Sequence, residues 1–173
     1  LGEGNGTYLY DATTRTLKLN NVNITAENDA AIKILDRYPD CTIVVTGTNK
    51  IQGNYNHCIE SYSNFTISGD GTLEMTNGKT TAASVIYCGP YKSLSIGAEV
   101  ILRNDRNAGN LIFTVKDNAY SFADGYNLYA STNSTGEPLE KYSSAKYSSY
   151  QYLRVTKETL PTGSETTYDV TIT

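Results

Sequence analysis

The sequence predicts an all-β fold, a right-handed parallel β-helix (solenoid) of about five short coils with a C-terminal capping segment. Two observations lead to this prediction: the composition and a degenerate repeat. Hydrophobic residues make up 39% of the 173 residues, charged residues only 18%, and Tyr alone occurs 15 times. Because β-branched and aromatic side chains favour strands while Asn and Gly favour turns, a chain rich in Thr, Tyr, Asn and Gly favours strands over helices.

The repeat is an alternating apolar stretch that closes on a turn containing Gly or Asn and is followed by a second stretch. It occurs at residues 16–25, 41–51, 65–75, 93–102 and 119–129. Superposing the copies predicts one inward column of side chains with separations of 26, 22, 29 and 26 residues, formed by Leu19, Val45, Ile67, Ile96 and Phe122. Each separation is the length of one coil, and each coil depends on its neighbours to bury its apolar face.

A third short apolar element follows each of the first four copies, at residues 31–35, 58–60, 85–87 and 111–115. Each coil is therefore expected to carry three short strands. Since alternate side chains of a strand point to the same face, taking Ile32, Ile59, Ile86 and Ile112 as inward predicts that the next residues point outward on neighbouring coils. These outward residues are Lys33, Glu60, Tyr87 and Phe113.

The pattern changes after about residue 130. We expect residues 1–130 to form the β-helix and residues 131–156 to cap its open end, with a strand at 150–156. Such a cap is needed because a last coil otherwise exposes unpaired backbone and apolar surface. Residues 157–173 are expected to be a terminal strand or a linker toward a following domain, with Pro161 and Gly163 ahead of the alternating segment 167–173.

The three cysteines, Cys41, Cys58 and Cys88, contain no C-x-x-C pair. This spacing argues against a zinc ribbon or a dithiol redox motif. We interpret them as small hydrophobic residues of the core. A Cys58–Cys88 or Cys41–Cys58 disulfide is the alternative, because secreted chains permit disulfides.

Charge and motif content argue against several classes of function. The formal net charge is −4 and the basic residues are scattered, which argues against nucleic-acid binding. The sequence has no apolar run of the roughly 18 residues that span a bilayer, so direct membrane insertion is not expected. Acidic residues such as Asp70, Asp105 and Asp124 stand singly near turns, and His57 is the only histidine. We therefore expect no enzymatic activity, no catalytic residues, no metal and no cofactor.

The segment "YLYDATTRTLKLNNVNIT", followed by "CTIVVTGTNKI" and "FTISGDGTLEM", resembles the β-helix modules of large Gram-positive bacterial cell-surface proteins labelled carbohydrate-binding, a branch of the pectate-lyase-like superfamily. The resemblance covers roughly residues 7–129, and the tail "YSSYQYLRVT" is also similar to the end of such modules. It implies an extracellular, cell-surface or secreted location and a polysaccharide or host or cell-wall glycan as partner. Acidic clusters with calcium, used by some members, are not evident in this sequence.

The candidate ligand-binding surface follows from the predicted outward positions and the adjoining corner. It consists of Lys33, Glu60, Tyr62, Tyr87 and Tyr91. Exposed aromatic rings beside polar groups can stack on sugar rings and bond their hydroxyls. The alternative interpretation is that Lys33 and Glu60 form a weak surface ion pair and the tyrosines shield the strands.

The sequence thus favours a non-catalytic, monomeric module that is the polysaccharide-binding or adhesive part of a larger protein. A structural spacer without ligand is the alternative, and a polysaccharide lyase or hydrolase is a third hypothesis. The fold by itself does not choose among these functions.

Overall fold

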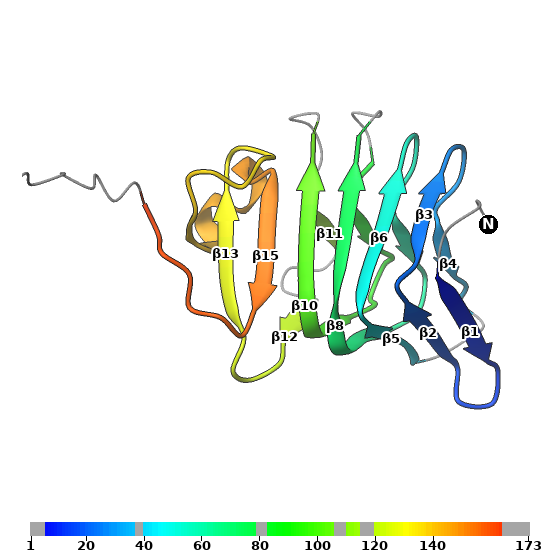
Figure 1. Ribbon diagram of the computed structural model, residues 1–173. Helices are drawn as coiled ribbons and strands as arrows, with labels where there is room; N and C mark the ends of the chain where they lie inside the picture. Colours follow the sequence, from blue (N-terminus) through cyan, green and yellow to red (C-terminus); the bar gives the residue numbers. More distant parts are fainter. Residues whose placement is uncertain (1–5, 37–39, 79–82, 106–109, 115–119, 164–173) are drawn as a thin grey trace, which may run out of the picture.

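The computed structural model describes residues 6–36, 40–78, 83–105, 110–114 and 120–163. They form an all-β solenoid of about three turns with little helix. Figure 1 shows two layers, a large sheet and, behind it, a small sheet. The one helical element in these ranges is the short 3-10 helix η1 (Ser144–Ser149).

The large sheet contains eleven strands and the small sheet four. The strands of the large sheet are β1 (Thr7–Asp11), β2 (Thr16–Asn20), β3 (Asn23–Ala26), β5 (Cys41–Thr46), β6 (Thr48–Gly53), β8 (Phe65–Asn77), β10 (Leu94–Asn104), β12 (Tyr120–Phe122), β13 (Asn127–Ser131), β14 (Glu140–Lys141) and β15 (Tyr152–Thr156). Those of the small sheet are β4 (Ile32–Ile34), β7 (Ile59–Ser61), β9 (Ile86–Cys88) and β11 (Ile112–Thr114).

The central strands stack in parallel, one coil on the next, as the repeat predicted. In the large sheet β2, β5, β8, β10 and β12 follow one another in parallel, and β3 and β6 join the same stack through β8. In the small sheet β4, β7, β9 and β11 are also parallel. Each coil therefore crosses from the large sheet to the small one and back, which places the apolar core between them.

The count of about five coils is too high: the stack makes about three turns, and the last copy of the repeat does not close a coil. Its first part, β12, stacks in parallel on β10, whereas its second part, β13, pairs antiparallel with β15. Strand β15 itself lies antiparallel on β10, with Val155 opposite Val100. The C-terminal segment thus occupies the edge on which a further parallel strand would have stacked.

The predicted inward column is wrong at one step. Leu19 is paired with Val45, and Ile96 is paired with Ile67 on one side and Phe122 on the other, as expected. Val45, however, is paired with Gly69, and Ile67 with Ile43. The coil between them is 24 residues long instead of 22, so the five side chains belong to two adjacent columns of one core.

The cause of this error is the choice of corner glycine. The superposition matched Gly47 to Gly69, but the register of β5, β6 and β8 places Gly47 beside Gly71. Gly69 has a φ of 122°, and a side chain there would collide with the backbone carbonyl of Val45. Glycine is required at this position because the strands of neighbouring coils approach so closely.

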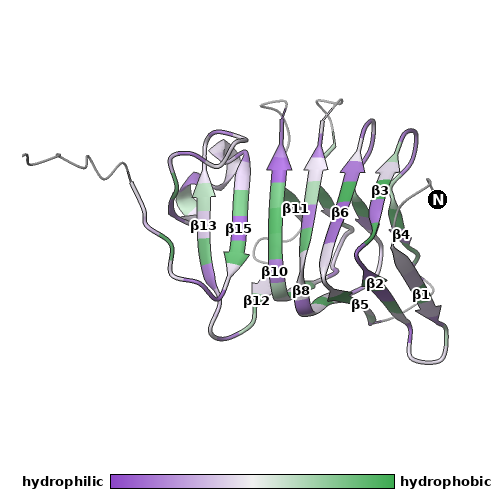
Figure 2. Ribbon diagram, viewed as in Figure 1, coloured by the Kyte–Doolittle hydropathy of each residue, from purple (hydrophilic) through white to green (hydrophobic). Residues whose placement is uncertain are grey.

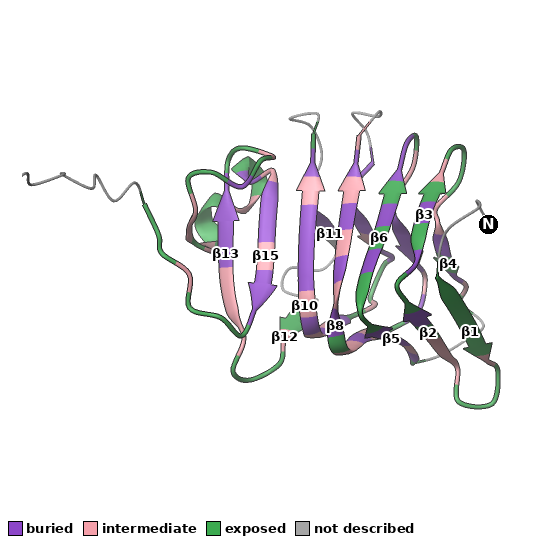
Figure 3. Ribbon diagram, viewed as in Figure 1, coloured by how far each residue is buried: buried purple, intermediate pink, exposed green. Residues whose placement is uncertain are grey.

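The core consists of the inward residues of both sheets. Side chains such as Val45, Ile67, Leu73 and Ile96 are completely buried. Figures 2 and 3 show apolar and buried segments on β8 and β10 and also on the C-terminal strands β13 and β15, whereas β1 is exposed. Burial of each such side chain contributes roughly 1.5–3 kcal/mol, and the interfaces between coils therefore hold the solenoid together.

A buried asparagine replaces an apolar residue at one corner of the core. Asn49 is opposite Leu73 of the next coil and is fully buried. Its Oδ1 accepts a hydrogen bond from the Val22 N–H at 3.1 Å, and its Nδ2 donates to the carbonyls of Thr46 and Thr72 at 3.1 and 3.3 Å. The amide therefore ties three coils together where the backbone turns, which satisfies polar groups that would otherwise be buried without a partner.

The cysteines are buried thiols, and no disulfide joins these three described residues. This confirms their interpretation as core residues. The Cys58 Sγ donates to the Thr76 carbonyl at 3.3 Å. Burial raises the pKa of Cys58 to about 12 and that of Cys88 to about 11, so both stay protonated at neutral pH.

Tyrosines link the C-terminal segment to the last coil. The hydroxyls of Tyr120 and Tyr142 are 2.6 Å apart, and the Tyr147 hydroxyl accepts a hydrogen bond from the Ile112 N–H at 2.9 Å. Further along, the Leu160 N–H donates to the Tyr129 hydroxyl at 2.8 Å. The alternating segment predicted at 167–173 lies outside the described residues.

Candidate functional site

The outward side of the small sheet carries the predicted candidate residues, and we call it the outer face. The register pairs Lys33 with Glu60 and Glu60 with Tyr87, as predicted. The backbone of Phe113 continues this row opposite Tyr87, but its side chain lies outside what the structure describes. Since neighbouring parallel strands are roughly 4.8 Å apart, the side chains of this row can touch one another.

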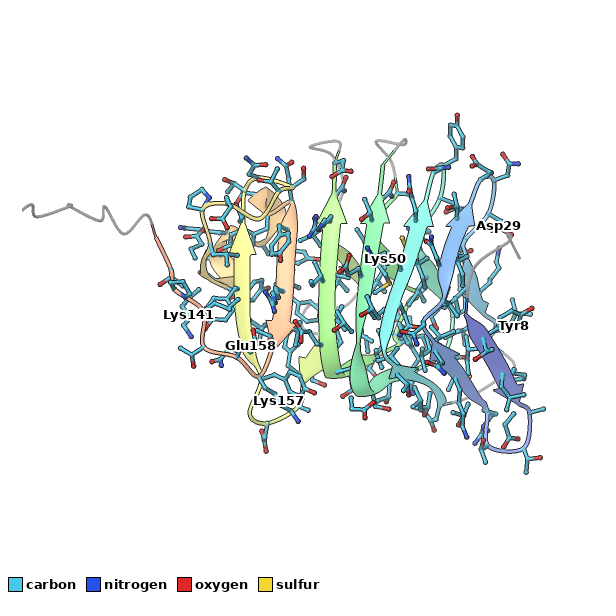
Figure 4. All side chains as sticks on the ribbon, viewed as in Figure 1. Tyr8, Asp29, Lys50, Lys141, Lys157 and Glu158 are labelled. Atoms are coloured by element: carbon cyan, nitrogen blue, oxygen red, sulfur yellow. The ribbon has the colours of Figure 1, made fainter. Side chains whose placement is uncertain are left out.

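Lys33 and Glu60 form the ion pair of the outer face. The Lys33 Nζ is 3.0 Å from Glu60 Oε2 and 3.3 Å from Asp29 Oδ1. Within the described part of the chain Oε2 accepts no hydrogen bond of good geometry, so the contact with Lys33 is mainly electrostatic. Asp29 was not predicted. Figure 4 shows it beside the connection that follows β3, and its place four residues before Lys33 is the signal that could have found it.

Tyr62 is tied to the same carboxylate from the corner after β7. Its hydroxyl donates to Glu60 Oε1 at 2.6 Å, while its backbone N–H donates to the Ile34 carbonyl at 2.8 Å. The backbone of Tyr62 is therefore held by the preceding coil, and its hydroxyl is held by Glu60 of its own coil. The short distance is typical of an O–H donor bound to a charged acceptor.

These contacts shift the pKa of each partner. Burial raises the pKa of Glu60, but the hydrogen bond from Tyr62 and the nearby Lys33 ammonium together outweigh burial, and the pKa lies below its ordinary value. The hydrogen bond to Glu60 raises the pKa of Tyr62, and Glu60 followed by Asp29 raises that of Lys33. At neutral pH the carboxylates and the ammonium are all charged.

Three rings lie side by side next to this ion pair. The ring centroids of Tyr87 and His57 are 5.1 Å apart with an angle of 30° between planes, and those of Tyr87 and Tyr62 are 5.8 Å apart at 57°. The His57 Nδ1 is 2.9 Å from the Ser84 carbonyl oxygen, which fixes the imidazole. Tyr87, in β9, is therefore the centre of an aromatic group. Its two neighbours, His57 before β7 and Tyr62 after β7, come from the preceding coil.

His57 was missed as a member of this surface. The sequence showed only an isolated histidine before a strand, for which a surface or turn role was expected, without any link to the other candidate residues. The coil period itself contained the missing signal: His57 and Ser84 are 27 residues apart, the separation that also joins Glu60 to Tyr87. Residues one coil apart are neighbours in a solenoid even when they lie outside its strands.

Tyr91 does not join the other four predicted residues. It lies in the turn after β9 with a φ of 60° and is 87% exposed. It has no hydrogen bond or ring contact with the described residues of the outer face. The structure thus brings together Lys33, Glu60, Tyr62 and Tyr87 and leaves Tyr91 apart.

The outer face is a surface and not a cavity. A hollow of about 290 Å³ shares Lys33 with it, but its other lining residues, among them Leu17, Ile34 and Ile43, belong to the open end of the core. A ligand on the outer face would therefore lie across the strands. The groups that a ligand could contact there are ring faces, a charged ammonium, and hydroxyl or carboxylate oxygens.

The described ranges contain neither a group of metal ligands nor a membrane-spanning helix. No group of three or more His, Cys, Asp or Glu side chains there could hold a metal ion. No helix in the same ranges is long and apolar enough to cross a membrane.

No family model matches this chain, and neither a curated protein nor a solved structure matches it. The solenoid fold therefore stands on the strand register alone. The resemblance to cell-surface carbohydrate-binding modules stays a prediction.

Proposed function

We propose that this chain is a non-catalytic extracellular module, the polysaccharide-binding or adhesive part of a larger bacterial cell-surface protein. The observation that carries the proposal is the group of stacked rings around Tyr87 beside the Lys33–Glu60 ion pair on the outer face. Rings of this kind pack against the C–H faces of sugars, while polar groups at their edge bond the hydroxyls.

The outer face is also organised before any ligand arrives. Glu60 orients both Tyr62 and Lys33, and the Ser84 carbonyl orients His57. Side chains that are already ordered lose less conformational entropy on binding, which favours affinity. The row runs across consecutive coils, so an extended glycan is a better match for it than a small molecule.

The lowered pKa of Glu60 supports a role in binding and not in acid catalysis. A general acid that works near neutral pH needs a carboxyl group with a raised pKa. The pKa of Glu60 is lowered instead, and both Glu60 and Asp29 are held by the same Lys33 ammonium. We therefore propose that these carboxylates position neighbours and do not transfer protons.

Two finer features of the fold belong to the proposal. We propose right-handed coiling, because parallel crossover connections are right-handed in nearly all known cases. We also propose that residues 131–156 act as the cap, supported by the antiparallel β15 on β10 and by the hydrogen bond from Ile112 to Tyr147.

A structural spacer is the second candidate, and one observation favours it. The polar groups of the outer face already satisfy one another, since Lys33 contacts two carboxylates and Tyr62 donates to Glu60. A glycan would have to displace some of these internal contacts in order to bind. In a spacer the contacts stay intact, because no ligand displaces them.

A glycan array followed by calorimetry distinguishes the two candidates. We expect the wild-type protein to bind at least one glycan class, and the double variant Tyr62→Ala/Tyr87→Ala to bind it at least about 10-fold more weakly, a loss of about 1.4 kcal/mol. Tyr126→Ala is the matched control, because its ring stacks under Lys157, far from this surface at the other end of the molecule. The variant Tyr91→Ala, measured separately, tests whether this isolated tyrosine contributes to glycan binding.

The outcomes are separable. Absence of binding to every glycan at high protein concentration favours the spacer. Binding that the double variant retains, with unchanged circular dichroism, would show that the glycan occupies another surface.

A further inference from the structure

Among the described residues, the first strand of the large sheet has one edge that pairs with no other strand. Strand β1 pairs antiparallel with β2, and it is the terminal strand of the sheet order. Figures 1 and 3 show it at the extreme N-terminal end, exposed along its length. One row of its backbone N–H and C=O groups therefore faces solvent, ready to pair with another strand.

This edge is unusually apolar. Tyr8, Leu9 and Tyr10 are 53%, 62% and 48% exposed, and Figure 4 shows Tyr8 on the outermost strand of the molecule. Proteins commonly protect such edges with Lys, Pro or a β-bulge. Strand β1 contains neither residue, and its register with β2 runs without a shift.

Behind the strand, the core is incompletely covered. Tyr8 is paired with Leu19 and Tyr10 with Leu17, so both tyrosines extend the inward columns of the large sheet. The small sheet ends one strand earlier, at β4. The hollow of about 290 Å³ at this end is lined by Tyr10 and by core residues such as Ile32 and Ile34.

The sequence of β1 is nearly symmetric about its central residue. Reading Thr7–Asp11 from either end gives a polar residue, a tyrosine and then Leu9. Antiparallel pairing of two copies about Leu9 places Tyr8 opposite the second copy's Tyr10 and Asp11 opposite its Thr7 hydroxyl. Parallel in-register pairing would instead set the two Asp11 carboxylates side by side, which is destabilising.

We propose that two copies of this chain associate through β1, with a two-fold axis at Leu9 that joins their large sheets into one. Both copies use the same patch, as in other two-fold interfaces. The four tyrosines lie on the inner side of the joined sheet, where they cover the open ends of both cores.

The contact area makes this a weak dimer. A fully buried aromatic side chain covers roughly 150–250 Å², so two half-exposed rings contribute roughly 150–250 Å² per copy. The total surface that the two copies bury, including both Leu9 side chains, is therefore below the roughly 1,200 Å² of a stable interface. On this proposal the protein is a monomer when dilute and pairs where copies are concentrated.

Sedimentation from about 10 µM to about 1 mM tests the association. The expected result is a mean mass that rises toward twice the monomer mass for wild type and stays at the monomer value for Leu9→Lys, because two like charges then meet at the axis. Ser121→Lys, at an exposed position of β12, is the control and should dimerise as wild type does. A monomer at every concentration, or equal behaviour of the two Lys variants, overturns the proposal.

Cysteine cross-linking tests the register independently. With oxidised glutathione, Leu9→Cys should form a disulfide-linked dimer, because paired β-carbons across antiparallel strands lie roughly 4.5–5.5 Å apart. Thr7→Cys should cross-link only when mixed with Asp11→Cys. The native thiols are buried, so they do not compete. Cross-linking of Leu9→Cys that is no faster than that of the exposed control Tyr55→Cys contradicts the proposed axis.

Discussion

The inward and outward faces of the small sheet are built from neighbouring residues, yet they obey different constraints. The first inward position is isoleucine in all four strands of the small sheet, and those four side chains are at most 9% exposed: Ile32, Ile59, Ile86 and Ile112. One residue further along, the described outward side chains are a lysine, a glutamate and a tyrosine. The stack repeats the residue that packs in the core and varies the residue on the outer face.

This difference assigns separate tasks to the two faces. Inward residues contact the coils above and below, so any loss of volume leaves a cavity that the stack cannot close. Outward residues contact one another through an ion pair, a hydrogen bond and ring stacking. Changes on the inward side should therefore reduce stability, whereas changes on the outward side should reduce binding.

The largest expected effect is that of Ile86→Ala. Ile86 is fully buried between Ile59 and Ile112, and its truncation should lower the free energy of unfolding by about 2–5 kcal/mol. Urea denaturation followed by circular dichroism measures this change. A loss of no more than that of the adjacent Tyr87→Ala would remove the distinction between the two faces.

The variant Ser61→Ala tests how much a buried polar side chain on the inward side of the small sheet contributes to stability. The buried Ser61 hydroxyl donates to the Ser63 carbonyl at 2.7 Å and accepts from the Ser63 N–H at 3.2 Å. Removing it leaves both groups without this partner and should cost about 1–3 kcal/mol in urea denaturation. Ser144→Ala, at an exposed position of η1, is the control and should change little. An unchanged stability of Ser61→Ala would show that water replaces the hydroxyl.

Tyr87→Ala should have a smaller effect on stability. It removes two ring contacts of a partly exposed side chain, which are worth about 0.5–1.5 kcal/mol. The same denaturation experiment measures it, with Tyr126→Ala as the matched aromatic control. A loss as large as that of Ile86→Ala would mean that the ring supports the fold and is not kept for binding.

The sequence was sufficient to predict the parallel stack because the repeat records which residues lie one coil apart. The pairing of Lys33 with Glu60 and Tyr87 follows directly from the repeated isoleucines. The step from Val45 to Ile67 was wrong because two glycines stand near one corner, and spacing alone does not say which of them turns the chain. The repeat gives no information on how the stack ends. We could therefore predict that β15 is a strand, but not that it pairs antiparallel with β10.

The candidate site was predictable only in part, for a related physical reason. Alternation along strands identifies outward residues, which gave Lys33, Glu60 and Tyr87. Residues at corners have no alternation to follow, and their direction depends on local backbone geometry. That is why Tyr62 joined the outer face while Tyr91, with its positive φ, did not, and why His57 was overlooked.

The smallest expected effect is that of Glu60→Gln, and it depends on pH. The pKa of Glu60 in the folded protein lies below the ordinary value of 4.5, so its charged form stabilises the fold fully above pH 4.5 and loses this effect as the pH falls through the folded pKa. Glutamine keeps the shape but does not ionise. Near neutral pH the variant should therefore be less stable than wild type by under about 1 kcal/mol, because the contacts are partly exposed.

Urea midpoints of the two proteins between neutral and strongly acidic pH test this sign. Asp11 and Glu140 also have lowered pKa values, but both proteins contain them, so they cancel in the difference between the two curves. The difference reports Glu60 together with Asp29, because the two carboxylates share the Lys33 ammonium. The two curves should converge as the solution is acidified. A constant or growing difference would show that the charge of Glu60 is not what stabilises the outer face.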